Sequence, residues 1–427
     1  MSLCLCVFVG DYIFVCLLPA STQREPTDSP LHISTSALAR LQDSTALYHR
    51  TCASPASSAY LHSLEMLEIT LSSLGWTPAL DEVFKKDHAG RGLMPARVSR
   101  NSKQIYHILC EDGEFVARVS GNFRHHARIP SDYPAVGDWV VIKTRPDDGE
   151  AEILALLPRR TVFSRQAVSA AGADSQSREQ VLATNVDVAL LVAALDGARG
   201  FNLRRLERYL TLARNSGAKP VLILNKIDLC DDPAPAIAAT EAIAAGAPVH
   251  ALSALDESAI GPLRELIGEG TTIVLLGPSG IGKSTIINAI AGEEIMSTGE
   301  VRESDHRGRH TTTWSELNII ERGGILIDTP GLRDVQLWTD QAAIDQTFAE
   351  IQKLALECRF RDCQHQKEPG CAVRQALDDD KLDAKRLQSY FKQTAEAAEA
   401  ELRRQRDVKK KHAKSRRTGR RGGTKKS

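Results

Sequence analysis

Short apolar runs dominate the first well-patterned part of this chain, between residues 91 and 157. Branched, aromatic and alternating residues fill the runs at 105–109, 114–119 and 139–143, and Gly, Asp, Asn and Pro separate them. Closely spaced short strands of this kind are typical of a small barrel, and an OB-fold is the obvious candidate. We therefore predict an OB-fold over residues 91–157, preceded by an N-terminal segment over 66–90.

Longer apolar runs alternate with helical periodicity after residue 181. The run at 186–194 is almost unbroken, as expected for a parallel strand that is buried on both faces. Similar runs lie at 220–224, 272–276 and 325–327. The pattern predicts an α/β domain over residues 181–340, with a parallel sheet between two layers of helices. A helical pattern then covers residues 341–402.

Two stretches lack such patterns. Residues 158–180, with Ala, Gly, Asp, Ser and Gln in their second half, are predicted to be a linker. Residues 1–65 begin with an apolar run that resembles a signal peptide, but the run lacks a basic flank, contains Asp11 and is short for a membrane span. Our hypothesis is that residues 1–65 are a non-native or disordered extension and that the chain proper starts at Met66; a transit peptide is the alternative. No later stretch is long and apolar enough to span a membrane, so we expect no membrane association.

Composition adds a strong asymmetry of charge. The 427 residues include 54 Lys and Arg and 54 Asp and Glu, so the formal net charge is zero. Residues 403–427 hold 13 of the basic residues and one acid, which leaves residues 1–402 with a net charge of −12. Such a block is usually disordered and often contacts nucleic acid, so we predict a basic disordered tail over 403–427; a tail that only aids solubility is the alternative. The nine cysteines do not suggest a disulfide framework, which indicates a reducing cytoplasm.

A phosphate-binding loop directly follows the run at 272–276. Its pattern is Gly, four residues, Gly, Lys and Ser, between a predicted strand and a predicted helix, which is the context that the motif requires. Backbone N–H groups of such a loop wrap phosphates, Lys283 would bridge the β- and γ-phosphates, and Ser284 would give Mg²⁺ a hydroxyl ligand. We therefore predict nucleotide contacts from Gly277, Pro278, Ser279, Gly280, Ile281, Gly282, Lys283, Ser284 and Thr285.

A second motif, Asn225-Lys226-Ile227-Asp228, selects the base. A carboxylate at Asp228 accepts hydrogen bonds from the guanine N1–H and exocyclic amine, whereas adenine would leave it unpaired. The motif therefore predicts GTP and GDP as ligands. The alternatives are a strand-end cap, and a P-loop kinase or ATPase. The short loop that lies behind the guanine in GTPases is expected to contain Ser253 and Ala254.

The switch elements and the catalytic groups come from two further motifs. Asp328-Thr329-Pro330-Gly331 ends the run at 325–327, so Asp328 can hold Mg²⁺ through water and the Gly331 N–H can reach the γ-phosphate. Thr312 is the preferred switch ligand of Mg²⁺, and Thr311 is the alternative. Leu332 stands where many GTPases have the glutamine that orients water, so we expect slow intrinsic hydrolysis. His310 is the candidate to position that water, or else a solvent-facing histidine. The predicted catalytic set is His310, Lys283, Asp328 and Thr312.

Four candidate metal ligands lie close together near the C-terminal end: Cys358, Cys363, His365 and Cys371. Three thiolates and one imidazole suit tetrahedral Zn²⁺, and a site filled by four protein ligands is structural. The spacing therefore predicts one structural zinc ion within residues 341–402. Free thiols brought together by chance are the alternative, and a catalytic zinc is less favoured because no open position is evident.

The order of the motifs is unusual, because the guanine motif precedes the phosphate-binding loop, whereas ordinary GTPases have the reverse order. From about residue 92 to about residue 392, the chain resembles the circularly permuted, ribosome small-subunit-dependent GTPase A family. Besides the motifs above, the resemblance rests on Val-Gly-Asp-Trp-Val at 136–140, Phe-Asn-Leu-x4-Arg-Tyr-Leu at 201–210 and Gly-Arg-His-Thr-Thr-Thr at 308–313.

This resemblance implies an OB-fold, a circularly permuted GTPase domain and a small zinc-binding helical domain. It also implies a cytoplasmic GTPase that acts in late maturation of the 30S subunit, contacts its 16S rRNA and is stimulated by that subunit; we expect a monomer. A GTP-binding RNA scaffold without turnover is the alternative. Because Leu332 and Cys358 are only 26 positions apart, we expect the nucleotide state to move the zinc domain relative to the barrel.

Overall fold

The computed structural model divides the chain into two compact units, residues 1–67 and residues 68–427. In the first unit, β1 (Leu5–Val9) and β2 (Tyr12–Cys16) form an antiparallel hairpin. The hypothesis of a non-native extension stays a prediction. The residues that the structure describes are 5–9, 12–16, 69–102, 104–145, 149–167, 178–197, 200–296, 315–320, 324–329 and 340–421.

A closed five-stranded barrel opens the second unit, in agreement with the predicted barrel. Its strands follow the order β3-β4-β5-β7-β6, and β6 pairs back onto β3. Only β5 and β7 are parallel. The interior is apolar, with Val98, Ile108, Val140 and Ile153 fully buried. The strands are β3 (Met94–Ser102), β4 (Ile105–Cys110), β5 (Gly113–Val119), β6 (Trp139–Arg145) and β7 (Glu150–Leu156).

The segment before the barrel packs against it. Helix α3 (Pro78–His88) is capped by Thr77, whose side chain accepts the Leu80 N–H. Trp76 lies edge-on to the buried Trp139, with ring centroids 4.7 Å apart. On the barrel itself, α4 (Gly121–His126) and the short turn η2 (Pro130–Asp132) separate β5 from β6.

A parallel sheet forms the centre of the next domain and confirms the predicted α/β class. The order is β12-β11-β10-β13-β15, all parallel, with the antiparallel β14 at the edge. Every residue of β10 is buried, as its unbroken apolar run predicts. The strands are β10 (Val188–Ala194), β11 (Lys219–Asn225), β12 (Val249–Ala251), β13 (Thr271–Leu276), β14 (Glu316–Ile319) and β15 (Gly324–Asp328).

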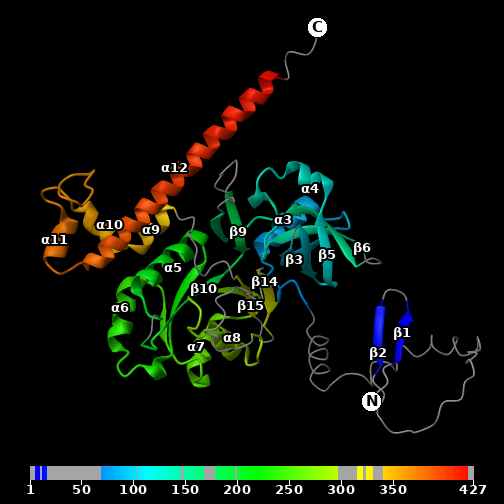
Figure 1. Cartoon of the computed structure of the whole chain (residues 1–427), viewed down its shortest axis with the longest axis horizontal. Coiled ribbons are helices and arrows are strands. Elements are labelled where there is room, and N and C mark those ends of the chain that lie inside the picture. Colours follow the sequence, from blue (N-terminus) through cyan, green and yellow to red (C-terminus); the bar gives the residue numbers. More distant parts are fainter. Residues whose placement is uncertain are drawn as a thin grey trace, which may run out of the picture. The chain divides into compact units, whose positions relative to one another are not determined.

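Helices cover both faces of this sheet (Figure 1). Helices α5 (Leu203–Ser216) and α6 (Ala234–Ala244) pack on the face that carries Leu191 and Leu222. On the face that carries Leu190, the short turn η5 (Glu257–Ile260), α7 (Gly261–Leu266) and α8 (Lys283–Ala291) make the second layer. Alternate residues of one strand therefore serve two separate apolar cores, as the period of a strand requires.

The barrel and the α/β domain are joined through their sheets. One ladder pair, Glu316 opposite Arg100, joins β14 to β3. The predicted linker at 158–180 differs from the structure, because β8 (Val162–Ala167) pairs antiparallel with β9 (Arg178–Thr184). Fully buried Phe163 packs in the core of the α/β domain and fixes β8 there. The polar second half of the segment led to the prediction of a linker, although this aromatic residue indicates a buried strand.

The remaining helices form a helical unit that carries the cysteine cluster. They are α9 (Gln341–Thr347), α10 (Ala349–Leu356), α11 (Ala372–Asp378) and α12 (Ala384–Arg421). Figure 1 shows α12 as one continuous helix. It runs through most of the tail predicted to be disordered, because Lys, Arg, Gln and Ala are strong helix formers. No described helix is long and apolar enough to cross a membrane.

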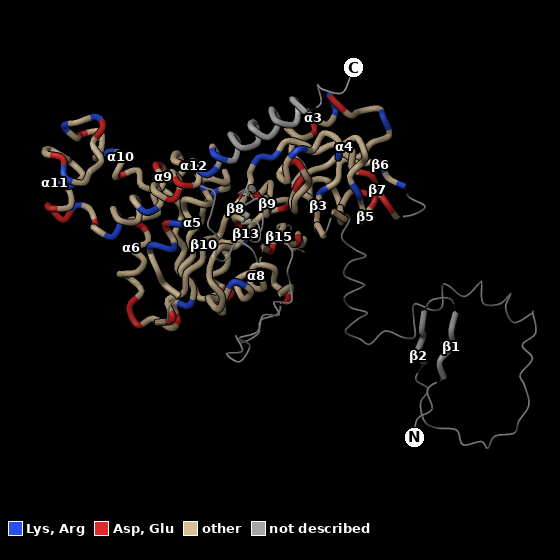
Figure 2. The backbone as a smooth tube through the Cα atoms, turned by 45° about the horizontal axis from the view of Figure 1, so that its top comes forward, with Lys and Arg blue, Asp and Glu red and all other residues tan. Residues whose placement is uncertain are grey.

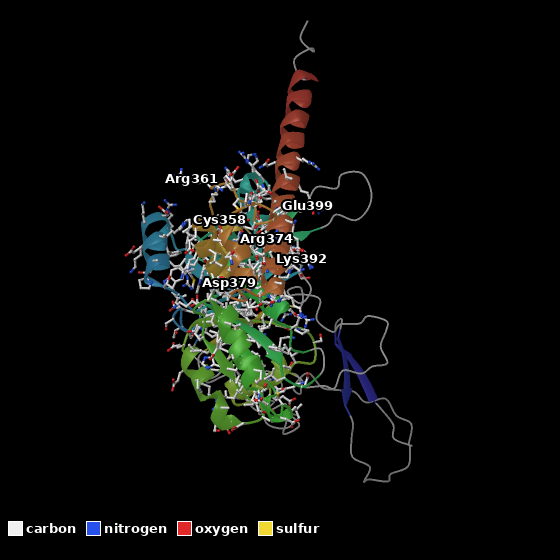
Figure 3. All side chains as sticks on the ribbon, turned by 90° about the vertical axis from the view of Figure 1, so that its left-hand side faces the viewer. Cys358, Arg361, Arg374, Asp379, Lys392 and Glu399 are labelled. Atoms are coloured by element: carbon white, nitrogen blue, oxygen red, sulfur yellow. The ribbon has the colours of Figure 1, made fainter. Side chains whose placement is uncertain are left out.

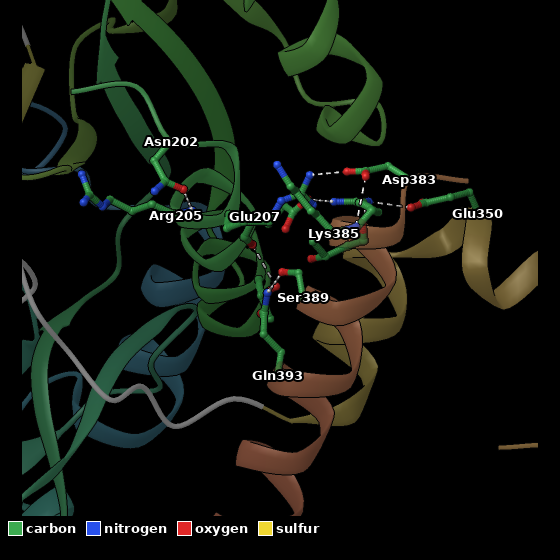
Figure 4. A network of polar contacts seen from close by, with 12 residues as sticks. Asn202, Arg205, Glu207, Glu350, Asp383, Lys385, Ser389 and Gln393 are labelled. Carbon is green, nitrogen blue, oxygen red and sulfur yellow. Dashed lines mark hydrogen bonds and ion pairs between the residues drawn. The ribbon is translucent and has the colours of Figure 1, made fainter. Parts of the chain in front are cut away.

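Buried charges hold the helical unit against α5 (Figure 4). Glu207 of α5 is fully buried, and its carboxylate pairs with Arg386 of α12 at 2.9 Å and with Arg204. Arg386 also reaches Glu350 at 2.7 Å, and Arg204 reaches Asp383 at 2.7 Å. Helix α5 is therefore the platform on which the helical unit docks.

Candidate functional site

The predicted nucleotide motifs meet at the carboxyl ends of the parallel strands. The guanine motif follows β11, the loop with Ser253 and Ala254 follows β12, the phosphate-binding loop follows β13, and Asp328 ends β15. In open α/β sheets, ligands bind beyond these strand ends. Four segments that are spread between Asn225 and Asp328 thus come to one edge of the sheet.

The phosphate-binding loop has a backbone that glycine alone fits well. Gly280 and Gly282 have φ angles of +81° and +90°, in the left-handed region. A Cβ at Gly282 would lie 2.4 Å from Asn225 Nδ2, so the loop presses directly on the guanine motif. Lys283 begins α8, and its ammonium donates to the carbonyl oxygens of Gly277 and Pro278, at 2.8 Å and 2.5 Å. The ammonium of the lysine predicted to hold phosphates is therefore bound by carbonyl oxygens of its own loop.

Asn225 ties three loops together. Its side chain is 1% exposed, donates from Nδ2 to the Ile281 carbonyl at 2.9 Å, and accepts the Ala254 N–H at 2.9 Å. These bonds join the phosphate-binding loop to the loop after β12. The structure thus gives Asn225 a scaffolding position, which the motif by itself did not reveal.

Lys226 stands in a strained conformation and has a partner that the sequence reading missed. Its φ is +62°, and its ammonium pairs with Asp196 at 2.9 Å and donates to the Gly280 carbonyl at 2.8 Å. Asp196 comes just after β10, whose carboxyl end lies between those of β11 and β13. An acid directly after a buried parallel strand is the signal that could have found it.

The edge of the site around Asp228 is open. Asp228 lies exposed in the short turn η4 (Ile227–Leu229), next to Leu229, which is 61% exposed. Leu255, on the loop that Asn225 anchors, is 82% exposed. A carboxylate beside uncovered apolar side chains offers the contacts that the edge and face of a planar base require.

Only part of the predicted catalytic set can be placed. Asp328 is half-buried at the end of β15, and Ser284 and Thr285 are half-buried in the first turn of α8. His310, Thr311, Thr312, Gly331 and Leu332 lie outside the described residues. Their roles remain predictions.

The four predicted zinc ligands come together on the helical unit. Figure 3 labels one of them, Cys358. Their ligand atoms all lie within 4.8 Å of one another. The Cys358 and Cys371 sulfurs are 3.8 Å apart, and His365 Nδ1 lies 3.6 Å and 3.4 Å from them. Ligands about 2.3 Å (sulfur) and 2.1 Å (nitrogen) from a tetrahedral zinc would be separated by roughly 3.6–3.8 Å. The donor set and its spacing therefore fit zinc.

The close approach of the thiols shifts their pKa values in opposite directions. Burial and the neighbouring thiols raise the pKa of Cys363 to about 11. Burial opposes ionisation of Cys358 as well, but the N–H groups of Val373 and Ala372 outweigh it and lower the pKa of that thiol. Burial also lowers the pKa of His365, which favours the neutral imidazole that a metal needs.

Glu368 organises the loop that carries His365, and sequence reasoning missed it. Its carboxylate accepts the N–H groups of Gln364 at 3.1 Å and of Gln366 and Lys367 at 2.9 Å each. Its own backbone N–H and these three bonds lower the pKa of Glu368 to about 2. The anion thereby fixes the backbone around His365, whose φ of +59° is otherwise unfavourable.

Comparison with known proteins gives one family. The family model of the RsgA GTPase matches residues 156–338. A relative from Opitutus terrae, named "Small ribosomal subunit biogenesis GTPase RsgA", is 47% identical over 341 residues, which are 78% of this chain and 91% of that protein. A relative of the same name from Syntrophotalea carbinolica is 43% identical, over 78% of this chain and 91% of the relative.

Two solved structures share the fold. YjeQ from Thermotoga maritima is 24% identical with a TM-score of 0.54, over 72% of this chain and 99% of that one. YloQ, described as a circularly permuted GTPase, is 24% identical with a TM-score of 0.52, over 73% and 98%. The match supports the permuted order of motifs that the sequence shows.

Proposed function

This chain belongs to the RsgA GTPase family and is a GTP-hydrolysing enzyme, and on that premise we propose that it acts in late maturation of the 30S ribosomal subunit. The observation that carries the proposal is 47% identity across 91% of a relative named for small-subunit biogenesis. The proposed partners are the 30S particle and its 16S rRNA, met in the cytoplasm by a monomer.

Membership of the family implies the use of guanine nucleotide and Mg²⁺. In the proposed site, Asp228 accepts the two guanine N–H donors, while Lys226 flanks the base. Lys283 moves from its loop carbonyls to the phosphates, which offer an ammonium much stronger acceptors. Ser284, Thr312 and Asp328 are the residues that would hold Mg²⁺, which would neutralise charge on the phosphates.

Hydrolysis needs an oriented water, and Leu332 cannot supply the hydrogen bond that a glutamine would. Turnover of the chain alone is therefore proposed to be slow, and the 30S subunit is proposed to complete the site. His310 is the candidate that positions the water once the subunit is bound. Phosphoryl transfer depends mainly on such positioning and on charge stabilisation.

Three further features are proposed to help the chain bind the subunit. The four ligands Cys358, Cys363, His365 and Cys371 would hold one structural zinc ion, which stabilises the loops of the helical unit. The barrel, proposed to be an OB-fold, would contact rRNA with its exposed cations and rings. The basic end of α12 would add sequence-independent attraction to phosphates.

The decisive experiment is GTP turnover by the purified chain alone, with 30S subunits and with 50S subunits. We expect slow turnover alone, a large stimulation by 30S and little by 50S. Equal turnover in the three reactions would refute the subunit-dependent role, and turnover of ATP at the same rate would refute the base assignment.

The matched variant for base selection is Asp228→Asn. Xanthine has a carbonyl where guanine has the amine, so an amide side chain can pair with xanthine through one donor and one acceptor. We expect the variant to lose affinity for GTP by at least tenfold and to gain turnover of xanthosine triphosphate. A variant that keeps its preference for GTP would show that Asp228 does not read the base.

A further inference from the structure

We propose that a ledge on the barrel, formed by residues 121–132, holds one unstacked nucleotide of single-stranded RNA and its neighbouring phosphates. This α4 ledge comprises helix α4 and the turn η2. The inference rests on the proposed ribosomal function and names the part of the barrel that would carry it.

Uncompensated positive charge is the first reason. Arg124, His125, His126 and Arg128 are all exposed. Among the described residues, neither arginine forms an ion pair with a carboxylate. The one acid of the ledge is Asp132, and its Oδ2 accepts the N–H groups of Arg128 and Ile129, at 2.7 Å and 3.0 Å. The arginine side chains thus remain available for phosphates, which guanidinium groups bind well.

A cavity beside these cations suits a nucleobase. Its volume is about 290 Å³, at the lower end for small-molecule sites. Half of its lining residues are apolar or aromatic and the other half are polar. The lining residues are Asn122, Phe123, His126, Ala127, Asp132 and Leu154. Aromatic and apolar surface together with hydrogen-bonding groups is how proteins hold splayed RNA bases.

The polar residues of the lining keep groups that can pair with a base edge. His126 Nδ1 lies 2.8 Å from the Asn122 carbonyl and donates to it, which leaves Nε2 for a ligand. Asp132 uses Oδ2 for both backbone bonds, so Oδ1 can accept a base N–H. The amide of Asn122 can donate or accept. Such mixed groups accommodate several bases, so we expect little sequence preference.

Buried charges hold the ledge in place. Arg159 donates to the carbonyls of Ser131 at 2.7 Å and Tyr133 at 2.9 Å, and it pairs with fully buried Asp138 at 2.7 Å. At the other end, Ser120 caps α4 by accepting the Phe123 N–H at 3.0 Å. A surface fixed before binding loses less entropy when it takes a ligand.

A second hollow of the same barrel lacks these properties. It has a volume of about 190 Å³, and its cations Arg118 and Arg145 stand among the acids Glu150 and Glu152. Figure 2 shows the same mixture of basic and acidic positions along β5, β6 and β7. This neutralised surface provides the matched control, because it carries two arginines on the same domain.

The test measures binding of a fluorescent single-stranded RNA 12-mer to the full-length chain by anisotropy, over a series of salt concentrations. The variants are Arg124→Ala/Arg128→Ala, His126→Ala and the control Arg118→Ala/Arg145→Ala. Each phosphate contact contributes roughly 0.7 to the slope of log K against log salt for a single strand. We expect the double ledge variant to lose about 1.4 units of slope, since it removes two such contacts.

The other variants separate base binding from charge. His126→Ala is expected to weaken binding several-fold with an unchanged slope, and the control variant to stay within twofold of the unaltered chain. Duplex RNA of the same length should show a smaller loss in the ledge variants, because its bases are not free to enter the cavity. Basal GTP turnover should not change, which shows that the variants are folded.

Three results would overturn the proposal: unchanged RNA binding by the ledge variants, an equal loss in the control, or a loss of 30S stimulation with RNA binding intact. The last result would assign the ledge to a ribosomal protein. Failure of the broader function looks different, because the unaltered chain would then show no 30S stimulation whatever the ledge binds.

Discussion

Replacing Arg386 with Met should loosen the helical unit from α5. The Arg386 side chain is 5% exposed, and its guanidinium pairs with Glu207 at 2.9 Å and with Glu350 at 2.7 Å. It also donates to the Thr347 carbonyl at 2.7 Å and lies 4.3 Å from the centroid of the Phe348 ring. Methionine keeps an apolar stem of similar length but removes the guanidinium, and with it both ion pairs, the hydrogen bond to Thr347 and the cation–π contact with the Phe348 ring.

The magnitude follows from what is left behind. Glu207 stays fully buried with Arg204 as its remaining cation. Removing one partner of a buried ion pair costs about 3–5 kcal/mol, and the retained Arg204 places this case near 3 kcal/mol. That is roughly a 100-fold shift in the equilibrium for undocking.

Two companion variants isolate the charge effect. Glu207→Gln combined with Arg386→Met removes both charges, so the double variant should cost about 1 kcal/mol, less than Arg386→Met alone. Arg208→Met is the matched control on the same two helices. Its pair with Glu396 has side chains 32% and 41% exposed, and exposed pairs contribute less than about 1 kcal/mol.

Native-state hydrogen exchange of the α9 and α12 amides measures the free energy of local opening directly. We expect faster exchange there in Arg386→Met, with the strands of the sheet unchanged. An opening free energy within 1 kcal/mol of the unaltered chain, or a double variant worse than the single one, would refute the view that an uncompensated Glu207 drives the loss.

Three further predictions concern the nucleotide and metal sites. Gly282→Ala should reduce GTP affinity at least tenfold, because its Cβ would clash with Asn225, whereas Gly246→Ala, with a similar φ and open space, should not; a fluorescent nucleotide titration compares them. Asp196→Asn should weaken GDP and GTP binding about tenfold by removing a charged partner of Lys226, and equal affinities in the same titration would contradict this. Glu368→Ala should lower zinc affinity about 10- to 100-fold, measured by competition with a chelator, and an unchanged affinity would count against its role in holding the loop.

The sequence could place the nucleotide loops because parallel strands end at a common edge. A motif after each apolar run is then enough to predict that Asp228, Gly277 and Asp328 approach one another. A different local signal, short spacing in sequence, predicted that Cys358 and Cys371 lie close together. Local patterns of this kind carry their own geometry.

The contacts that the sequence did not reveal join residues without any local pattern. Asp196 and Glu368 are single acids, and only the folded chain shows that one holds Lys226 and the other three backbone N–H groups. Glu207 and Arg386 look like ordinary charged residues of two amphipathic helices. Their burial depends on how α5 and α12 pack against each other. The hydrophobic periodicity of each helix does not predict that packing.

The docking of the helical unit changes the expected route from nucleotide to zinc. The sequence suggested a route through the segment after Asp328. The structure adds α5, whose Asn215 accepts the Asp340 N–H at 2.8 Å and whose Glu207 pairs with Arg386. The residues just before α5 include Asp196, the partner of the guanine-motif lysine. A swing of the zinc site relative to α5 must therefore break buried charge contacts, so we expect the unit to move together with α5 and with the guanine side of the site. The distance between spin labels on α5 and α12 should then be the same in the GDP and GTP-analogue states. A different distance in the two states would contradict this coupling and favour a route through the segment after Asp328 alone.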